Sequence, residues 1–129
     1  MDGASRGNPG PASIGVVFQN EKTGDARCLS KRIGVTTNNV AEYSALLFAM
    51  QEALVLGLKE LNIFTDSELL AKQFSGEYRV KDPLLKLLSL FVTHLGRAFR
   101  ELRVTHVPRE ENVLADREAN RALDQESFL

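Results

Sequence analysis

The chain has 129 residues, 43% of them apolar and 26% charged, so it is long enough for one hydrophobic core and too short for two. A formal charge of −1 excludes a protein that holds nucleic acid by bulk positive charge. The single cysteine, Cys28, has no partner for an internal disulfide, and no signal-like or membrane-length apolar run is found. We expect one domain over residues 1–129, monomeric and cytoplasmic, with no membrane contact.

The first third of the chain predicts a turn followed by a β-hairpin. Residues 2–11 are rich in glycine and proline and are typical of a turn. The apolar run Ile14–Phe18 and the run Ala26–Ile33 flank a polar turn at Glu21–Asp25, which is the pattern of two paired strands.

The remainder alternates helices with single strands, which favours an α/β fold with a helix-covered sheet. Val40, Tyr43, Leu47, Met50 and Leu54 repeat at helical spacing, with Glu42 at the edge of their stripe. In order, we expect a helix from Val40 to Leu56, a strand Glu60–Thr65, a helix Ser67–Phe74, a helix Pro83–Ala98, a strand Phe99–Val107, a helix capped by Asn112, and frayed residues after Gln125.

Four carboxylates stand at the ends of four of these elements. Asp2 lies in the opening turn, Glu42 near the start of the long helix, Asp66 after a strand, and Asp116 near the start of the last helix. Each also has a structural interpretation: Asn39 and Glu42 have capping-box spacing, and the three aspartates suit turns or helix starts. Four acids at one sheet edge would repel one another unless cations lay between them.

Oxygen ligands without histidine or cysteine favour Mg²⁺ or Mn²⁺ over zinc. Two such ions about 3.5–4 Å apart activate water and stabilise the leaving oxygen in an in-line attack on a phosphodiester. The four acids therefore indicate the chemistry of a metal-dependent nuclease.

Four blocks of sequence carry a more specific signal. They are Asp2-Gly3-Ala4-Ser5 with Gly7-Asn8-Pro9-Gly10-Pro11, Thr37-Asn38-Asn39 with Ala41-Glu42-Tyr43, Thr65-Asp66-Ser67, and Val107-Pro108-Arg109-Glu110 with Asn112 and Ala115-Asp116. In this order, covering nearly the whole chain, they resemble the successive motifs of type 1 ribonuclease H. The resemblance implies a mixed five-stranded sheet in the order 3-2-1-4-5 flanked by helices. It also implies hydrolysis of the RNA strand of RNA/DNA hybrids, leaving 5′-phosphate and 3′-hydroxyl ends.

The same resemblance implies roles for single residues. Asp2 would bridge two metal ions, Glu42 and Asp66 would complete the ion on the leaving-group side, and Asp116 would help to hold the ion that carries the attacking water. The residues that match hybrid-contacting positions of the family are Asn8, Thr37, Asn38 and Asn39. An asparagine amide both donates and accepts, as recognition of a ribose 2′-hydroxyl requires, although turn and cap duty is the alternative for these residues.

Arg109 stands where many relatives carry a mobile loop histidine, and in one branch of the family an arginine fills that role. We prefer Arg109 to His106, which should lie inside the last strand. The alternative for Arg109 is an ordinary surface arginine.

Two departures from the family pattern shape our expectations. Only Met1 stands where the family has an apolar opening strand, so we expect the first strand to be largely missing and the sheet to lack its central member. Residues 76–82 are too short for the basic helical insertion of some members, so hybrid binding would depend more on metal and on scattered arginines. These arginines are Arg97, Arg100 and Arg103.

Two alternatives to an active ribonuclease H stay open. A catalytically impaired hybrid-binding module would result if Asp2 were misplaced. Another nuclease of the same fold, of resolvase or integrase type, would also carry clustered acids, but the Asn8 and Asn38-Asn39 blocks speak against it.

Overall fold

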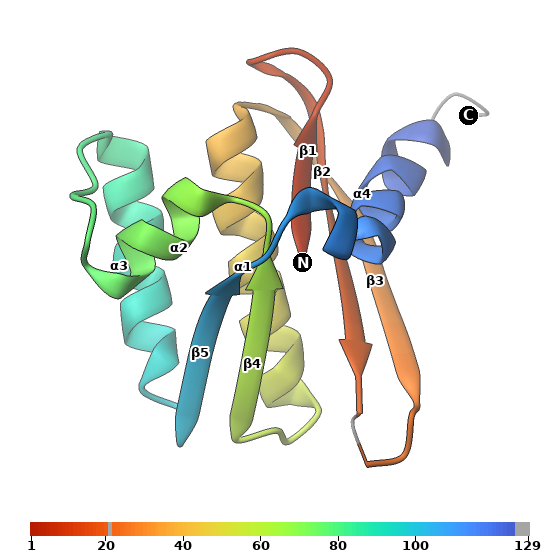
Figure 1. Cartoon of the computed structure of the whole chain (residues 1–129). Helices are drawn as coiled ribbons and strands as arrows, with labels where there is room; N and C mark the ends of the chain where they lie inside the picture. The colour runs from red at the N-terminus through yellow and green to blue at the C-terminus, as the bar shows by residue number, and fades with distance from the viewer. Residues whose placement is uncertain (21, 126–129) are drawn as a thin grey trace.

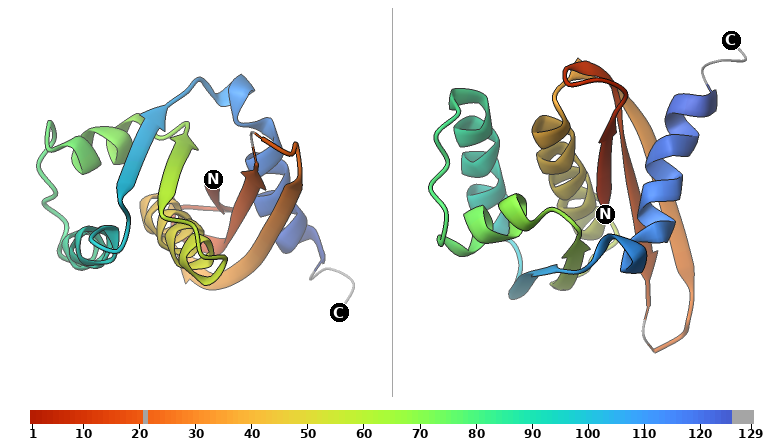
Figure 2. Two further views of the ribbon diagram at one scale, coloured as in Figure 1. Left: turned by 90° about the horizontal axis from the view of Figure 1, so that it is seen from below. Right: turned by 45° about the horizontal axis from the view of Figure 1, so that its top comes forward.

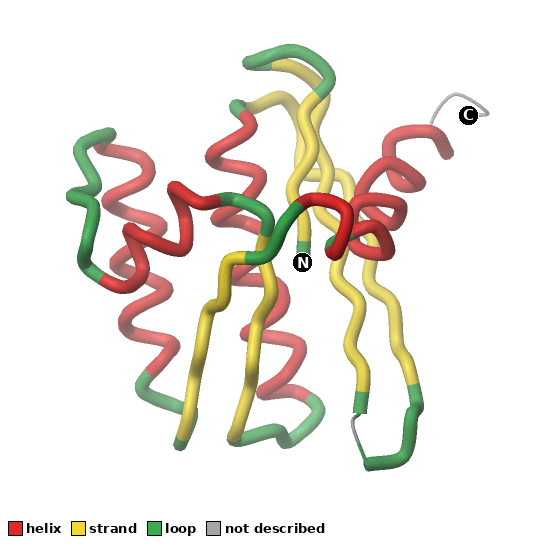
Figure 3. Tube along the Cα trace, viewed as in Figure 1, coloured by secondary structure: helices red, strands yellow, loops and turns green. Residues whose placement is uncertain are grey.

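The computed structural model describes residues 1–20 and 22–125, which form an α/β fold (Figure 1). In chain order the elements are β1 (Asp2–Ser5), β2 (Gly10–Gln19), β3 (Ala26–Thr36), α1 (Asn38–Val55), β4 (Glu60–Thr65), α2 (Glu68–Ser75), α3 (Pro83–Gly96), β5 (Glu101–His106), the 3₁₀ turn η1 (Arg109–Glu111) and α4 (Val113–Gln125). The expectations for Glu21 and for the residues after Gln125 lie outside this described part. After the hairpin, helices and strands alternate as predicted (Figure 3).

The strands form two hydrogen-bonded groups. β1, β2 and β3 pair antiparallel in that order, and β4 and β5 pair in parallel. The backbone nitrogen of Met1 donates to the carbonyl oxygen of Phe64 at 3.0 Å and links the start of β1 to β4. The two groups therefore follow the predicted order 3-2-1 and 4-5, with no continuous ladder between β1 and β4 among the described residues.

The opening segment is more regular than predicted. Asp2–Ser5 is a strand whose residues pair with Ala12 to Gly15, so the first strand is present, although it is only four residues long. Its small residues carry little strand preference of their own, and pairing with β2 supplies the ladder. As a result β2 begins at Gly10 rather than at Ile14.

Helices cover both faces of the hairpin. Figure 2 shows α1 and α4 on opposite sides of β1 and β2. A Cβ atom at Gly3 would lie 2.2 Å from the carbonyl carbon of Ala41, and one at Gly15 would lie 2.3 Å from the carbonyl oxygen of Ala115. Only glycine at these two positions lets α1 and α4 rest directly on the strands.

The buried face of α1 matches the predicted stripe in part, since Tyr43 and Met50 are buried as expected. Val40, Leu47 and Leu54 are only half-buried, whereas the most buried positions are largely alanine. The buried residues of α1 are Ala41, Glu42, Tyr43, Ala45, Leu46, Ala49, Met50 and Ala53. Glu42 thus belongs to the face that packs against the strands and not to its margin. No helix within the described ranges is both long and apolar enough to span a bilayer.

Candidate active site

Three carboxylates from three elements meet where β4 ends. Asp2 comes from β1, Glu42 from the second turn of α1, and Asp66 directly follows β4. Each offers an oxygen atom within 4.8 Å of the other two. Asp2 is 4% exposed and Glu42 is 6% exposed, while Asp66 is half-buried. The arrangement therefore concentrates negative charge in a place with little water to screen it.

Asp116 approaches from the other face of the hairpin. Asp2 and Gly15 are cross-strand partners, so they lie on the same side of β1 and β2. α4 packs on that side, with Ala115 against Gly15. Asp116 follows Ala115 in the chain, and its carboxyl group shares a hydrogen bond with that of Asp2. All four predicted acids are thus brought together near the start of β1 and the end of β4.

Two serine hydroxyl groups of the hairpin hold α4 in place. The hydroxyl of Ser13 donates to the carbonyl oxygen of Ala119, and that of Ser30 donates to the carbonyl oxygen of Glu118 at 2.9 Å. Neither serine belongs to one of the four sequence blocks described above. The one feature of the sequence that could have indicated Ser13 is its position as a small polar residue among the apolar residues of β2.

Asn112 ties the start of α4 to the start of β1. Its backbone carbonyl accepts from the N–H of Asp116 at 3.1 Å, as expected of a residue that begins a helix. Its buried side-chain amide donates to the carbonyl oxygen of Met1 at 2.8 Å. The side chain therefore links the backbone next to Asp2 with the helix of Asp116.

Glu42 and Asp66 do not serve as helix caps. Thr37 caps α1, its hydroxyl accepting from a backbone N–H at 3.3 Å, and the predicted capping box of Asn39 and Glu42 does not form. Ser67 caps α2 in the same way at 3.1 Å. The structural interpretations of these two acids fail, since other residues satisfy the helix ends.

The negative charges of Asp2, Glu42 and Asp66 are stable together only when protons or cations neutralise part of them. Burial, with the nearby charges of Asp2 and Asp66, raises the pKa of Glu42 to about 9. Burial, followed by the charge of Asp66 and the hydrogen bond with Asp116, raises the pKa of Asp2 to about 7. The Oε2 atom of Glu42 is buried without a hydrogen-bond partner in the described part of the chain. An unpartnered carboxylate oxygen among other acids fits a hard divalent cation.

Comparison with known proteins identifies the family. Residues 1–122 match the family described as reverse transcriptase-like. The crystal structure of the type 1 ribonuclease H of Halobacterium salinarum is similar, with a TM-score of 0.92 and 41% identity, over 96% of this chain and 94% of that one. The chain belongs to the type 1 ribonuclease H family.

Two further relatives of this ribonuclease H family member have known structures. A type 1 ribonuclease H isolated from compost, solved in complex with an RNA/DNA hybrid, is 42% identical with a TM-score of 0.91, over 97% of this chain and 94% of that one. The N-terminal ribonuclease H domain of a Mycobacterium tuberculosis protein is 41% identical with a TM-score of 0.88, over 94% and 93%.

The curated relatives of this family member are longer than the chain. A bifunctional protein of M. tuberculosis is 43% identical over 95% of this chain and 34% of its own length. The ribonuclease HI of H. salinarum is 42% identical over 96% of this chain and 62% of its own length. The chain thus spans between about a third and two thirds of these relatives.

The polar residues expected at the hybrid lie in the loop after β1 and at the start of α1. The Oδ1 atom of Asn8 accepts from the N–H of Asn38 at 2.9 Å, which joins the loop after β1 to the start of α1. Asn8, Asn38 and Asn39 are exposed, and Thr37 is half-buried. Asn8 and Thr37 therefore also have the turn and cap duties that the sequence left as the alternative.

Arg109 and His106, the two candidates for the role of the mobile loop histidine of many relatives, are both exposed. Arg109 opens η1, the turn between β5 and α4. His106 is the last residue of β5 and pairs with Thr65, the residue before Asp66. His106 thus belongs to the last strand as expected, and its exposed side chain lies at the end of the strand that is next to Asp66.

The three arginines expected to help in binding are exposed, and Arg100 lies far from the acids. Arg100 precedes β5 and pairs with Glu60 at 3.5 Å, at the opposite end of the strands from Asp66. Arg103 pairs with Glu101 on the same strand. Arg97, at the end of α3, is exposed as well. The position of Arg100 does not suit a contact to nucleic acid at the acidic edge.

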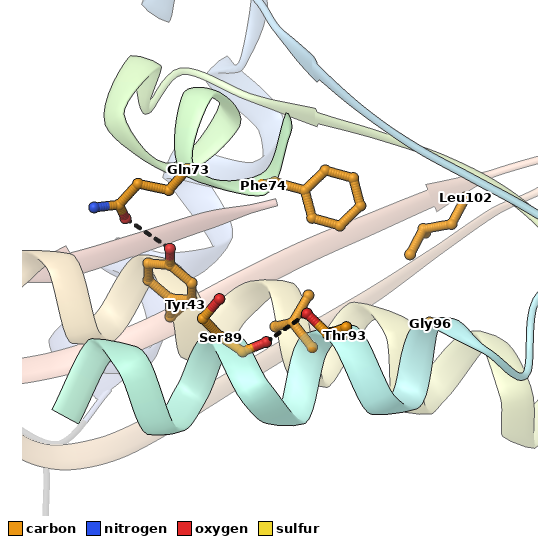
Figure 4. A pocket seen from close by; sticks show the side chains of 8 residues that line it. Tyr43, Gln73, Phe74, Ser89, Thr93, Gly96 and Leu102 are labelled. Atoms are coloured by element: carbon orange, nitrogen blue, oxygen red, sulfur yellow. Dashed lines mark hydrogen bonds between the residues drawn. The ribbon is translucent and has the colours of Figure 1, made fainter. Parts of the chain in front are cut away.

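A cavity of about 400 Å³ lies in the helical layer, next to Tyr43 (Figure 4). Its lining is uncharged and consists of Tyr43, Gln73, Phe74, Ser89, Val92, Thr93, Gly96 and Leu102. The hydroxyl of Tyr43 donates to Oε1 of Gln73 at 2.6 Å, so the turn of α1 that carries Glu42 is bound to α2. A neutral lining does not suit a phosphate or a metal ion, which leaves the acidic edge as the candidate site.

Proposed function

We propose that this chain hydrolyses the RNA strand of RNA/DNA hybrids with the help of divalent cations held by the four acids. The observation that carries the proposal is the meeting of Asp2, Glu42, Asp66 and Asp116 from four separate elements, with a buried oxygen of Glu42 left without a partner among the described residues. Family membership and the hybrid-bound relative from compost support the class of substrate.

The proposed complement is two Mg²⁺ or Mn²⁺ ions, for which hard oxygen donors are the suitable ligands. Asp2 would contact both ions, Glu42 and Asp66 the ion on the leaving-group side, and Asp116 the other. When bound, such ions supply an activated water and stabilise the leaving oxygen of an in-line displacement. The products would be 5′-phosphate and 3′-hydroxyl ends.

The protein itself supplies a rigid arrangement of charge. Asp2 and Glu42 are buried. The helices that carry Glu42 and Asp116 lie in backbone contact with the strands at Gly3 and Gly15, so little reorganisation is needed when cations arrive. Exposed amides at Asn8, Asn38 and Asn39, with Thr37, would contact the hybrid backbone and the ribose 2′-hydroxyls. Arg109, in the turn before the helix of Asp116, would assist turnover.

The test is digestion of labelled RNA/DNA hybrid, double-stranded RNA, double-stranded DNA and branched DNA with Mg²⁺ or Mn²⁺. We expect cleavage of the hybrid alone in its RNA strand, lost in Asp66→Asn and kept in Asp25→Asn, an exposed acid of the hairpin turn. An Asp66→Asn variant that cuts as fast as the parent would refute the assignment. Hybrid retention without cleavage would indicate a binding module, and preferred cleavage of branched DNA a nuclease of resolvase type.

A further inference from the structure

A side-chain amide on α4 contacts the fourth acid. Asn120 lies one helical turn after Asp116, and its Nδ2 atom donates to the backbone carbonyl oxygen of Asp116 at 2.9 Å. The same nitrogen lies 3.4 Å from Oδ1 of Asp116. Both residues are half-buried. One amide thus joins the backbone and the carboxylate of the same residue.

We propose that Asn120 is a positioning residue that holds the carboxylate of Asp116 in the orientation facing Asp2, with one oxygen engaged and the other left for a cation. The inference rests on the proposed function, because it concerns the use of the same four acids. Asn120 lies outside the four sequence blocks that match the family motifs.

Asp116 has more need of orientation than the other three acids. The group whose oxygen atoms lie within 4.8 Å of one another comprises Asp2, Glu42 and Asp66, and Asp116 stands outside it. The hydroxyls of Ser13 and Ser30 fix the backbone of α4, but they do not reach the carboxylate. An aspartate side chain at a half-buried helix start has several rotamers, and a hydrogen bond to one oxygen selects among them.

The neutral charge of the donor also matters. α4 carries arginines at positions 117 and 121, and Arg121 pairs with Glu118 at 3.8 Å. A cation at position 120 would compete with a divalent ion for the Asp116 carboxylate, whereas an amide orients it without cancelling its charge. Asparagine is a poor helix former, so its presence in the interior of α4 is not explained by helix stability.

The experiment compares Asn120→Ala, Asn120→Gln and, as a matched control on the same helix, Arg121→Ala. Binding of Mn²⁺ and of Mg²⁺ alone is measured by calorimetry, the Mg²⁺ dependence of kcat and the KM for hybrid by kinetics, and Tm by thermal unfolding. For Asn120→Ala we expect metal affinity or kcat to fall about 10–100-fold. KM for hybrid should not change, and Tm should be equal or higher because alanine favours the helix. Asn120→Gln should recover part of the loss, and Arg121→Ala should match the parent.

Unchanged metal binding and kcat in Asn120→Ala would overturn the proposal. A loss of activity that follows a lower Tm, with the metal dependence of the parent, would also overturn it by assigning Asn120 a merely structural part. If the parent chain cleaves no hybrid, the proposed function fails on its own, and the metal titrations still decide the role of Asn120.

Discussion

The two groups of strands hold their acids by different means. In the antiparallel group, β1 to β3, the helices that carry Glu42 and Asp116 lie in backbone contact with the strands at Gly3 and Gly15. In the parallel group, Asp66 extends from the end of β4, where the N–H of Val107 donates to the carbonyl oxygen of Thr65 at 2.8 Å. Asp2, Glu42 and Asp116 thus belong to one closely packed unit of strands and helices. Asp66 comes from the other group of strands, which has no strand pairing with β1 in the described part of the chain.

The comparison teaches that small residues, more than large apolar ones, set the geometry of the acidic site. A side chain at Gly3 or Gly15 would push a whole helix away and its acid with it. Large apolar residues such as Leu46 and Met50 fill the core and stabilise the fold by burial.

The largest expected effect on hybrid cleavage is that of Glu42→Gln. This substitution removes one charge from the closely packed unit and keeps the shape of the side chain. Loss of a preorganised charged group should lower hybrid cleavage by about 10²–10³-fold or more. Because the variant also removes a buried carboxylate, the metal-free protein should unfold at a higher Tm than the parent. The control is Glu52→Gln on the same helix, which should keep activity. Full activity in Glu42→Gln would contradict the account.

Gly15→Ala tests whether backbone contact positions Asp116. The new Cβ atom would lie 2.3 Å from the carbonyl oxygen of Ala115, so α4 must move. We expect a loss of about 1–3 kcal/mol in the free energy of unfolding, measured with urea. Gly96→Ala, whose Cβ would meet Leu102 at an ordinary 3.4 Å, is the control. Equal stabilities of the two variants would show that α4 adapts easily.

The stability of the metal-free protein should depend on pH through the two buried acids, Asp2 and Glu42. Folding raises the pKa of Glu42 from 4.5 to about 9 and that of Asp2 from 3.8 to about 7. Between the unfolded and the folded pKa of each group, the folded protein therefore binds more protons than the unfolded chain. Stability of the metal-free protein should therefore fall as pH rises through this window. Mg²⁺ binds the deprotonated acids, so it should raise Tm more at about pH 9 than at about pH 5. Thermal unfolding with EDTA or Mg²⁺ measures both effects. A metal-free Tm that rises over this range would count against the buried cluster.

The smallest expected effects concern the serine contacts of α4. Ser13→Ala and Ser30→Ala each remove one hydrogen bond to the helix backbone, for which about 0.5–1.5 kcal/mol is typical. Ser13 is fully buried and Ser30 half-buried, so Ser13→Ala should be the more destabilising in urea unfolding. The reverse order would mean that the two bonds are not what holds α4 to the hairpin.

Sequence motifs predicted the element order and the four acids, because each acid stands in a block with its own turn or helix signals. They did not predict β1 as a strand, since the small residues of Asp2–Ser5 gain their extended form from pairing with β2. The buried face of α1 was predicted only in part: Tyr43 and Met50 are buried, but the buried alanines were not included because alanine carries little apolar signal although it allows close packing. The position of Arg100 at the far end of the strands depends on strand direction and register, which a count of charges does not contain.

Anomalous diffraction from crystals soaked in Mn²⁺ shows whether the acids bind a divalent cation. We expect a peak at coordination distance, about 2–2.5 Å, from carboxylate oxygens of Asp2 and Glu42. Absence of a peak at the acids, at Mn²⁺ concentrations that saturate cleavage of the hybrid, would contradict this expectation.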